Sequence, residues 1–160
     1  MLLVAVLMAS GCGGGGPSQK TLAGTGYTFS APSSWSVART QRQVQASAGK
    51  ESLELVAVTR FRLLRAFRAE LWPKVIGELD RTAKGIAEQQ NGSVTETKTV
   101  TISGRRARWY TVAYDLRGKK LVERLVFVLR AKTEYFLLCR YEQGNGSKGC
   151  ELLLRTFRLV

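Results

Sequence analysis

The sequence predicts an α+β domain, in which an antiparallel sheet of six or seven strands is covered by one long central helix and a short C-terminal helix. Along most of the chain, apolar residues alternate with polar ones, which is typical of half-buried strands. One central segment, 73–90, instead repeats its apolar residues at spacings of three and four, as an amphipathic helix does. Short polar turns separate the strands after that segment, and such turns favour hairpins with antiparallel pairing.

Before the helix we expect three strands, over residues 27–31, 35–37 and 53–61. In the first of them aromatic residues alternate with small polar ones, and Pro32 ends it because proline cannot donate to a ladder. Trp35 and Val37 resume the alternation on a returning strand. The segment 41–48 carries only a weak pattern.

The central helix is expected to begin at Pro73, since proline suits the first helical position. It should end at Asn91-Gly92, which supplies a left-handed residue. Gly77 and Gly85 weaken this helix in isolation, so it must be held by packing on the sheet. Four more strands and the closing helix are expected over residues 93–102, 107–114, 121–129, 135–139 and 148–157. The third and fourth of these strands are apolar on both faces, which places them inside a sheet covered on both sides.

The chain begins with an apolar run, residues 1–8, followed by Ala9-Ser10-Gly11-Cys12 and four glycines. This order resembles the lipobox of bacterial lipoproteins. The resemblance implies the following organisation: a signal peptide over residues 1–11, a diacylglycerol on Cys12, a Gly-rich tether over residues 12–24 and a single domain over residues 25–160. We therefore expect an exported protein, lipid-anchored to the outer face of the bacterial cytoplasmic membrane; a secreted protein is the alternative. The apolar run is too short for a transmembrane helix, which needs about 20 residues.

Charge is the outlying property of the composition. The chain carries 25 Lys and Arg residues against 12 Asp and Glu and has no His, so its formal net charge is +13 at pH 7. A protein this basic is attracted to anionic surfaces, which at a cell envelope are phospholipid headgroups and wall polymers. An Arg-rich composition inherited from a GC-rich genome explains the charge equally well. The candidates for an anion-binding patch are Arg105, Arg106, Arg108 and Tyr110 at a predicted hairpin; a solvated hairpin tip is the alternative.

The three cysteines divide between two expected roles. Cys12 is assigned to the lipid by its motif, which leaves Cys139 and Cys150. An even pair in an exported domain indicates a disulfide. The polar, Gly-rich segment 140–149 between them allows a strand end to fold back beside the start of a helix. Two free core thiols are the alternative.

Four features of the sequence carry a family resemblance: the opening Tyr27-x-Phe29-x-x-Pro32-x-x-Trp35-x-Val37, the central amphipathic helix, the hairpin Ile102-x-Gly104-x-x-Ala107 and the ending Leu153-Leu154-x-x-Phe157. They resemble the PsbP-like, or Mog-like, α/β/α sandwich family, whose bacterial lipoprotein branch agrees with the leader. The resemblance implies the sandwich fold and no shared catalytic centre. The metal-associated His of the extrinsic photosystem II protein has no counterpart here, because the chain has no His.

The lack of His also limits the chemistry. It excludes Ser-His and Cys-His nucleophile pairs, and two sulfurs alone cannot complete a zinc tetrahedron. We therefore expect no enzyme activity and no catalytic, metal or cofactor site. Glu78 and Asp80 on the central helix are expected to face solvent, and Asp115 and Glu123 are expected to pair with arginines.

The expected function is that of a non-enzymatic cell-envelope lipoprotein domain that binds a partner protein or an anionic envelope component, and no nucleic acid. The alternative is a carrier that holds a small apolar or lipid-like ligand between sheet and helix. A filled core with an arginine-lined face favours the first function. An apolar cavity of about 300 Å³ or more favours the carrier.

Overall fold

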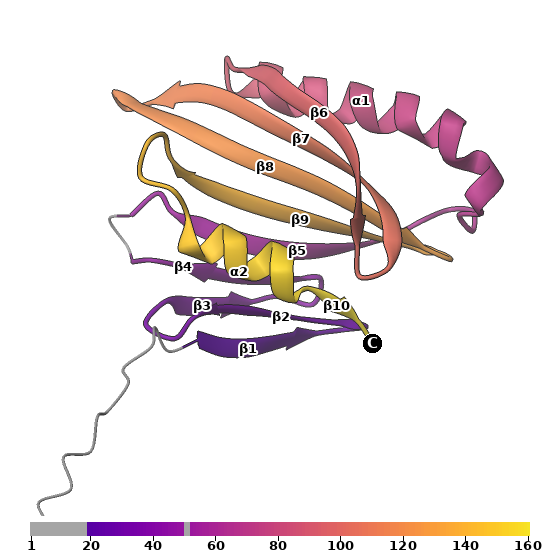
Figure 1. The fold of residues 1–160 in the computed structure, drawn as a ribbon, viewed down its shortest axis with the longest axis horizontal. Helices are drawn as coiled ribbons and strands as arrows, with labels where there is room; N and C mark the ends of the chain where they lie inside the picture. Colours follow the sequence, from indigo (N-terminus) through magenta and orange to yellow (C-terminus); the bar gives the residue numbers. More distant parts are fainter. Residues whose placement is uncertain (1–18, 50–51) are drawn as a thin grey trace, which may run out of the picture.

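A computed structural model describes residues 19–49 and 52–160 of the chain. They form a seven-stranded sheet in the order β3-β4-β5-β9-β8-β7-β6, a three-stranded sheet in the order β1-β2-β10, and two α-helices (Figure 1). The predicted α+β class, with one long helix and a short C-terminal helix, is confirmed. The predicted signal peptide and Cys12 lie outside the described residues. The elements are β1 (Gln19–Gly24), β2 (Tyr27–Pro32), β3 (Ser36–Arg39), β4 (Gln43–Ser47), β5 (Leu55–Arg62), a short 3-10 helix (Ala69–Leu71), α1 (Trp72–Gln89), β6 (Ser93–Ile102), β7 (Arg105–Leu116), β8 (Lys119–Arg130), β9 (Thr133–Glu142), α2 (Lys148–Thr156) and β10 (Arg158–Leu159).

The seven-stranded sheet carries a core on each face. Helix α1 lies along β6 and β7 (Figure 1), and its buried residues Leu79, Ala83 and Ala87 join the apolar side chains of β7 and β8. The other face packs against α2 and the three-stranded sheet, where the rings of Tyr27 and Phe157 stack with centroids 5.9 Å apart. The second half of β8 is buried on both faces, as its sequence predicts.

Strand β1 corrects the predicted boundary of the domain. Residues 19–24 pair with β2 along their whole length, so the prediction of a tether over residues 12–24 is wrong for its last six residues. Leu22 is the one buried residue of this strand. Because only one side chain points into the core, apolar and polar residues hardly alternate along this segment. The sequence therefore does not predict this strand.

The strands that follow β2 also differ from the prediction. Strands β2 and β3 belong to different sheets, so residues 35–37 do not return beside residues 27–31. The turn between them carries the chain from one sheet to the other, and Trp35 is buried in that turn rather than on a strand. The segment 41–48 contains β4, whose weak pattern reflects glutamines on the less covered face of the sheet.

Helix α2 is fixed to the sheet by a disulfide and a cap. Cys139 on β9 and Cys150 on α2 are bonded, with their Cα atoms 5.3 Å apart, and both are fully buried. The Ser147 hydroxyl accepts a hydrogen bond from the Cys150 backbone N at 2.9 Å, which caps the start of the helix. Gly149 lies against the indole of Trp35, so closely that a Cβ would clash. The bond that the sequence predicts thus belongs to the core between α2 and the sheet.

Candidate functional site

Cationic side chains gather at one end of the seven-stranded sheet. Because every neighbouring pair is antiparallel, β3, β5, β6 and β8 finish at this end and β4, β7 and β9 begin there. Arg62, for example, is opposite Thr133, which is in turn opposite Arg130. We call this the basic end and define it by the cationic residues of these strand ends and turns: Arg39, Arg42, Arg60, Arg62, Arg105, Arg106, Arg130 and Lys132.

Carboxylates do not balance the charge of the basic end. Within residues 19–49 and 52–160, the side chains of Arg42, Arg60 and Arg62 form no ion pair. Glu134 also lies at this end, where burial raises the pKa of its carboxyl, but it forms no ion pair with these three arginines in the described residues. The three guanidinium groups therefore keep their positive charge uncompensated by direct contacts.

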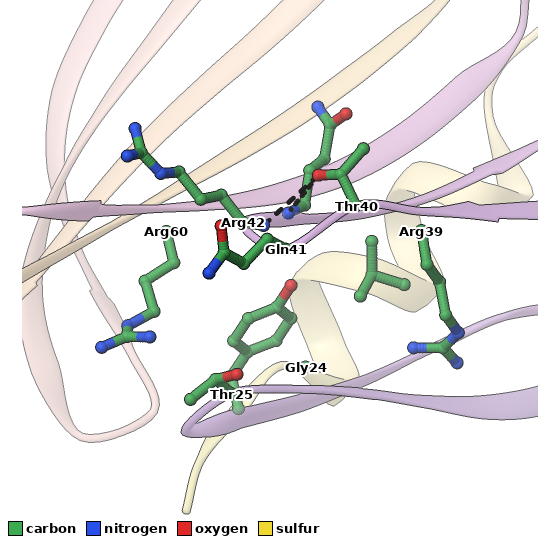
Figure 2. A pocket seen from close by; sticks show the side chains of 10 residues that line it. Gly24, Thr25, Arg39, Thr40, Gln41, Arg42 and Arg60 are labelled. Carbon is green, nitrogen blue, oxygen red and sulfur yellow. Dashed lines mark hydrogen bonds between the residues drawn. The ribbon is translucent and has the colours of Figure 1, made fainter.

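A pocket of about 100 Å³ opens at the basic end, between the β1–β2 turn, the β3–β4 turn and β5 (Figure 2). Arg42 and Arg60 extend to the same side of it, whereas Arg39 points to the other side and donates to the Ala23 carbonyl at 2.5 Å. Tyr27 donates from its hydroxyl to the Val58 carbonyl at 3.0 Å, and burial raises the pKa of this phenol. Tyr27 therefore brings no negative charge to the pocket. The lining also offers hydroxyl and amide groups from Thr25, Thr40, Gln41 and Gln43.

Local hydrogen bonds set the shape of the β3–β4 turn that carries Arg42. Thr40 Oγ1 accepts hydrogen bonds from the backbone N of Arg42 at 3.3 Å and of Gln43 at 3.1 Å (Figure 2). The backbone N of Arg60 donates to the Arg42 carbonyl at 2.8 Å and ties the turn to β5. Arg42 and Arg60 thus stand side by side on a hydrogen-bonded frame.

This geometry suits the binding of an anion. A larger hollow of about 400 Å³ shares Gln41, Arg42 and Arg60 with the pocket and adds Phe61 and Arg62. Guanidinium groups are planar donors that bind phosphate and carboxylate oxygens at two points. Since these arginines have no carboxylate partner within the described residues, they are available to an anion from outside the domain.

The structure divides the predicted patch of Arg105, Arg106, Arg108 and Tyr110. Arg108 binds Asp80 of α1, with Nε and Nη2 each 3.1 Å from Oδ1, and the Tyr110 hydroxyl donates to the same oxygen at 2.6 Å. Arg108 and Tyr110 are therefore engaged beneath the helix and are not free to bind an anion. Arg106 lies over the Trp72 ring at 5.7 Å and, together with Arg105, remains at the basic end.

The prediction that Asp80 faces solvent is only partly right, because its side chain is 44% exposed but bonds to Arg108 and Tyr110 of the sheet. Residues two apart on a helix point to different sides. Glu78 is on the solvent side, paired with Arg81 at 2.6 Å, so Asp80 turns toward the sheet. Burial, followed by the bond to Asp80, raises the pKa of Tyr110, so the phenol keeps its proton and donates it to the carboxylate.

A buried carboxylate, that of Glu123, has a structural role. Glu123 is only 3% exposed; it accepts hydrogen bonds from Tyr114 at 2.8 Å and Gln90 at 3.0 Å and lies 3.9 Å from Arg140. Its predicted pairing with an arginine is confirmed. Asp115 is exposed and forms no ion pair in the part of the chain that the structure describes. The Glu123 network fixes the C-terminal end of α1 to the sheet.

The alternative function, a carrier of a small apolar ligand, would need an apolar cavity between α1 and the sheet. A hollow of about 470 Å³ lies between α1 and β6, but its lining includes the charged side chains of Asp80, Lys84 and Glu88. It is not the apolar cavity that a carrier of apolar ligands needs. Across residues 19–49 and 52–160, no group of three or more Asp, Glu or Cys side chains is placed to hold a metal ion. No helix in the same residues is both long and apolar enough to span a membrane.

Comparison with solved structures identifies similar folds. The structure superposes on the solution structure of cyanobacterial PsbP (CyanoP) from Synechocystis sp. PCC 6803 with a TM-score of 0.61, over 94% of this chain and 98% of that one, at 13% sequence identity. The chain has a PsbP-like fold. No family model matches its sequence, and no curated protein does.

A second solved structure is similar to this one over part of its length. The crystal structure of a protein from Bacteroides thetaiotaomicron VPI-5482 matches with a TM-score of 0.62 at 10% identity, over 89% of this chain. The match covers 48% of that protein, so this chain spans about half of its length. At such identities the likeness concerns the fold alone, and function has to be argued from the residues of this chain.

Arg42, Arg60 and Arg62 are the part of the basic end that the sequence does not predict. Arg42 falls in segment 41–48, where the alternation of apolar and polar residues is weak. Arg60 and Arg62 stand at the end of a strand whose strongest signal is its apolar face. The available signal is the segment 60–68, in which arginines alternate with large apolar residues. What brings Arg42 beside Arg60 is the pairing of β4 with β5, which no local pattern encodes.

Proposed function

We propose that this protein is a non-enzymatic lipoprotein of the bacterial cell envelope, whose basic end binds the anionic headgroups of the membrane that anchors it. The observation that carries the proposal is the grouping of Arg42, Arg60 and Arg62 at one end of the sheet without carboxylate partners in the described residues. Two further features support it. The Ala9-Ser10-Gly11-Cys12 motif follows an apolar run, and the Cys139–Cys150 disulfide fits an oxidising, extracytoplasmic compartment.

The length of chain before β1 allows two contacts with one bilayer, the lipid on Cys12 and the basic end against the headgroups. Gln19 is at the opposite end of β1 from Gly24, which lines the arginine pocket. A six-residue strand extends about 20 Å, at roughly 3.3 Å per residue. The seven residues 12–18 span at most about 25 Å when extended. A lipid on Cys12 therefore leaves the basic end within reach of the same bilayer.

The two contacts would have different roles. The two acyl chains of a diacylglycerol anchor a protein stably, whereas basic residues near an anionic surface each add only about 1 kcal/mol. The lipid would hold the protein on the membrane, and the basic end would decide which face of the domain lies against the bilayer.

Vesicle sedimentation of the unacylated Cys12→Ser chain tests the proposal. The parent chain should bind phosphatidylglycerol-containing vesicles and not neutral phosphatidylcholine vesicles at 0.15 M salt. Adding R42Q, R60Q and R62Q should weaken binding about 100-fold, if each arginine contributes about 1 kcal/mol. The matched control removes three cations at the other end of the sheet, with R117Q, K119Q and K120Q, and should weaken binding far less, because the Debye length is about 8 Å.

Two results would contradict the proposal. Absence of binding to both vesicle types would remove the headgroup function altogether. Equal losses in the two triple variants would mean that only the total charge matters, as expected for a basic composition without a dedicated surface.

A further inference from the structure

The connection between β5 and α1 exposes apolar side chains among arginines. Residues 60–68 read Arg-Phe-Arg-Leu-Leu-Arg-Ala-Phe-Arg. Leu64 is 100% exposed and Phe61 is 41% exposed, and both are among the few large apolar residues on the described surface. A single exposed leucine is ordinary, but one at the apex of an arginine-rich loop, on the face already assigned to an anionic surface, is not explained by folding.

This loop is held in place at its base. The backbone N of Leu63 donates to the Lys132 carbonyl at 2.9 Å, and that of Phe67 donates to the Ala131 carbonyl at 2.7 Å. Phe67 also packs edge-on against Trp72, with ring centroids 6.2 Å apart. Residues 64–66 therefore project from a base that is tied to the β8–β9 turn, and Leu64 is presented to solvent by a fixed backbone.

Cationic groups lie on both sides of the projecting residues. On one side is the hollow that contains Arg42, Arg60 and Arg62. On the other side, a hollow of about 250 Å³ is lined by Phe67 and Trp72 together with Arg105 and Arg106. The loop itself adds Arg65, which is exposed, and Arg68, whose partner Glu70 is 3.2 Å away on the surface.

We propose that residues 61–66 form a membrane-insertion loop, in which Leu64 enters the hydrocarbon boundary of an anionic bilayer while the flanking arginines bind lipid phosphates. The inference rests on the proposed binding of headgroups by the basic end. Transfer of an exposed leucine from water into hydrocarbon is favourable, and arginine stems cover apolar surface while their charged heads stay in the interface. Apolar residues bordered by cations are the arrangement of segments that lie in membrane interfaces.

Tryptophan depth measurements test the insertion, with the Cys12→Ser chain as parent. Leu64→Trp places a fluorophore at the apex, and Lys120→Trp places the same fluorophore at an exposed position at the other end of the sheet. With phosphatidylglycerol vesicles that carry brominated acyl chains, Leu64→Trp should show a blue shift and bromine quenching beyond those of the parent. Lys120→Trp should show neither.

A second pair of variants measures the contribution of Leu64 to binding. Leu64→Ser should weaken vesicle binding about tenfold, while Val37→Ser, at another exposed apolar residue (37%), should leave it unchanged. Because Leu64 is fully exposed, its replacement leaves the core intact. Vesicle binding without quenching of Leu64→Trp, or full affinity of Leu64→Ser, would overturn the insertion, while headgroup binding stands. Failure of the parent to bind any vesicle would overturn both.

Discussion

Replacing Cys12 with Ser should move the protein from the membrane fraction to the soluble fraction of a bacterial host. The expected change is nearly complete, because loss of a diacylglycerol removes two acyl chains, and each buried methylene contributes about 0.8 kcal/mol. The basic end alone would leave a reversible, salt-sensitive attachment that a wash at 0.5 M salt removes, since the Debye length falls to a few ångströms. Fractionation followed by immunoblotting measures the change.

The natural chain serves as the control for this experiment. Mass spectrometry of the mature wild-type protein should find residues 1–11 removed and Cys12 carrying the lipid. An intact N-terminal peptide, or a Cys12→Ser chain that stays with the membrane after the salt wash, would contradict the anchor.

Reducing the Cys139–Cys150 disulfide should lower the free energy of unfolding by about 2–4 kcal/mol. The bond closes a loop with a sequence separation of 11 and joins β9 to α2 through two fully buried sulfurs. Helix α2 has only nine residues, and isolated helices shorter than about 12 residues are marginal in water. We therefore expect α2 to loosen first, at Leu153 and the residues around it.

Urea unfolding with and without dithiothreitol measures this loss, and hydrogen exchange locates it. The double variant Cys139→Ala with Cys150→Ala is the matched control, because dithiothreitol should have no further effect on it. A wild-type protein whose unfolding midpoint does not respond to reduction would show that the bond does not stabilise the fold.

The sequence correctly predicts the elements that bury many side chains along their whole length. Helix α1 spans residues 72–89, close to the expected 73–90, because its apolar stripe is long and because proline and Asn91-Gly92 mark its ends. Asn91 has a φ of 52°, which is the left-handed conformation expected there. Strand β8 is likewise placed correctly, since residues buried on both faces of a sheet leave a continuous apolar run.

The elements that escape prediction have few buried residues or depend on distant partners. Strand β1 buries Leu22 alone, and β4 alternates buried residues with partly exposed glutamines. That β2 and β3 separate into two sheets depends on β2 pairing with β10, which lies at the other end of the chain. No periodicity within either segment carries that information.

In the candidate site too, some features can be predicted from the sequence and others depend on residues brought together by the fold. Cys139 and Cys150 can be paired from the sequence because the composition and the expected export of the chain leave few other roles for them. The patch at residues 105–110 is half wrong, because Arg108 and Tyr110 bond to Asp80 of α1, whereas Arg106, on the same face of β7, lies nearer the strand end and against Trp72. Arg42 and Arg60 come together through the register of β4 and β5, so they become a site only in the folded chain.

Hydrogen–deuterium exchange of the Cys12→Ser chain on phosphatidylglycerol vesicles shows directly which end of the domain touches the membrane. We expect protection in the β3–β4 turn, the insertion loop of residues 61–66 and the β6–β7 and β8–β9 turns, and unchanged exchange in the β7–β8 turn over residues 116–120. Protection of the β7–β8 turn or of the α1–β6 hollow, with the basic end exchanging as it does in solution, would contradict this expectation.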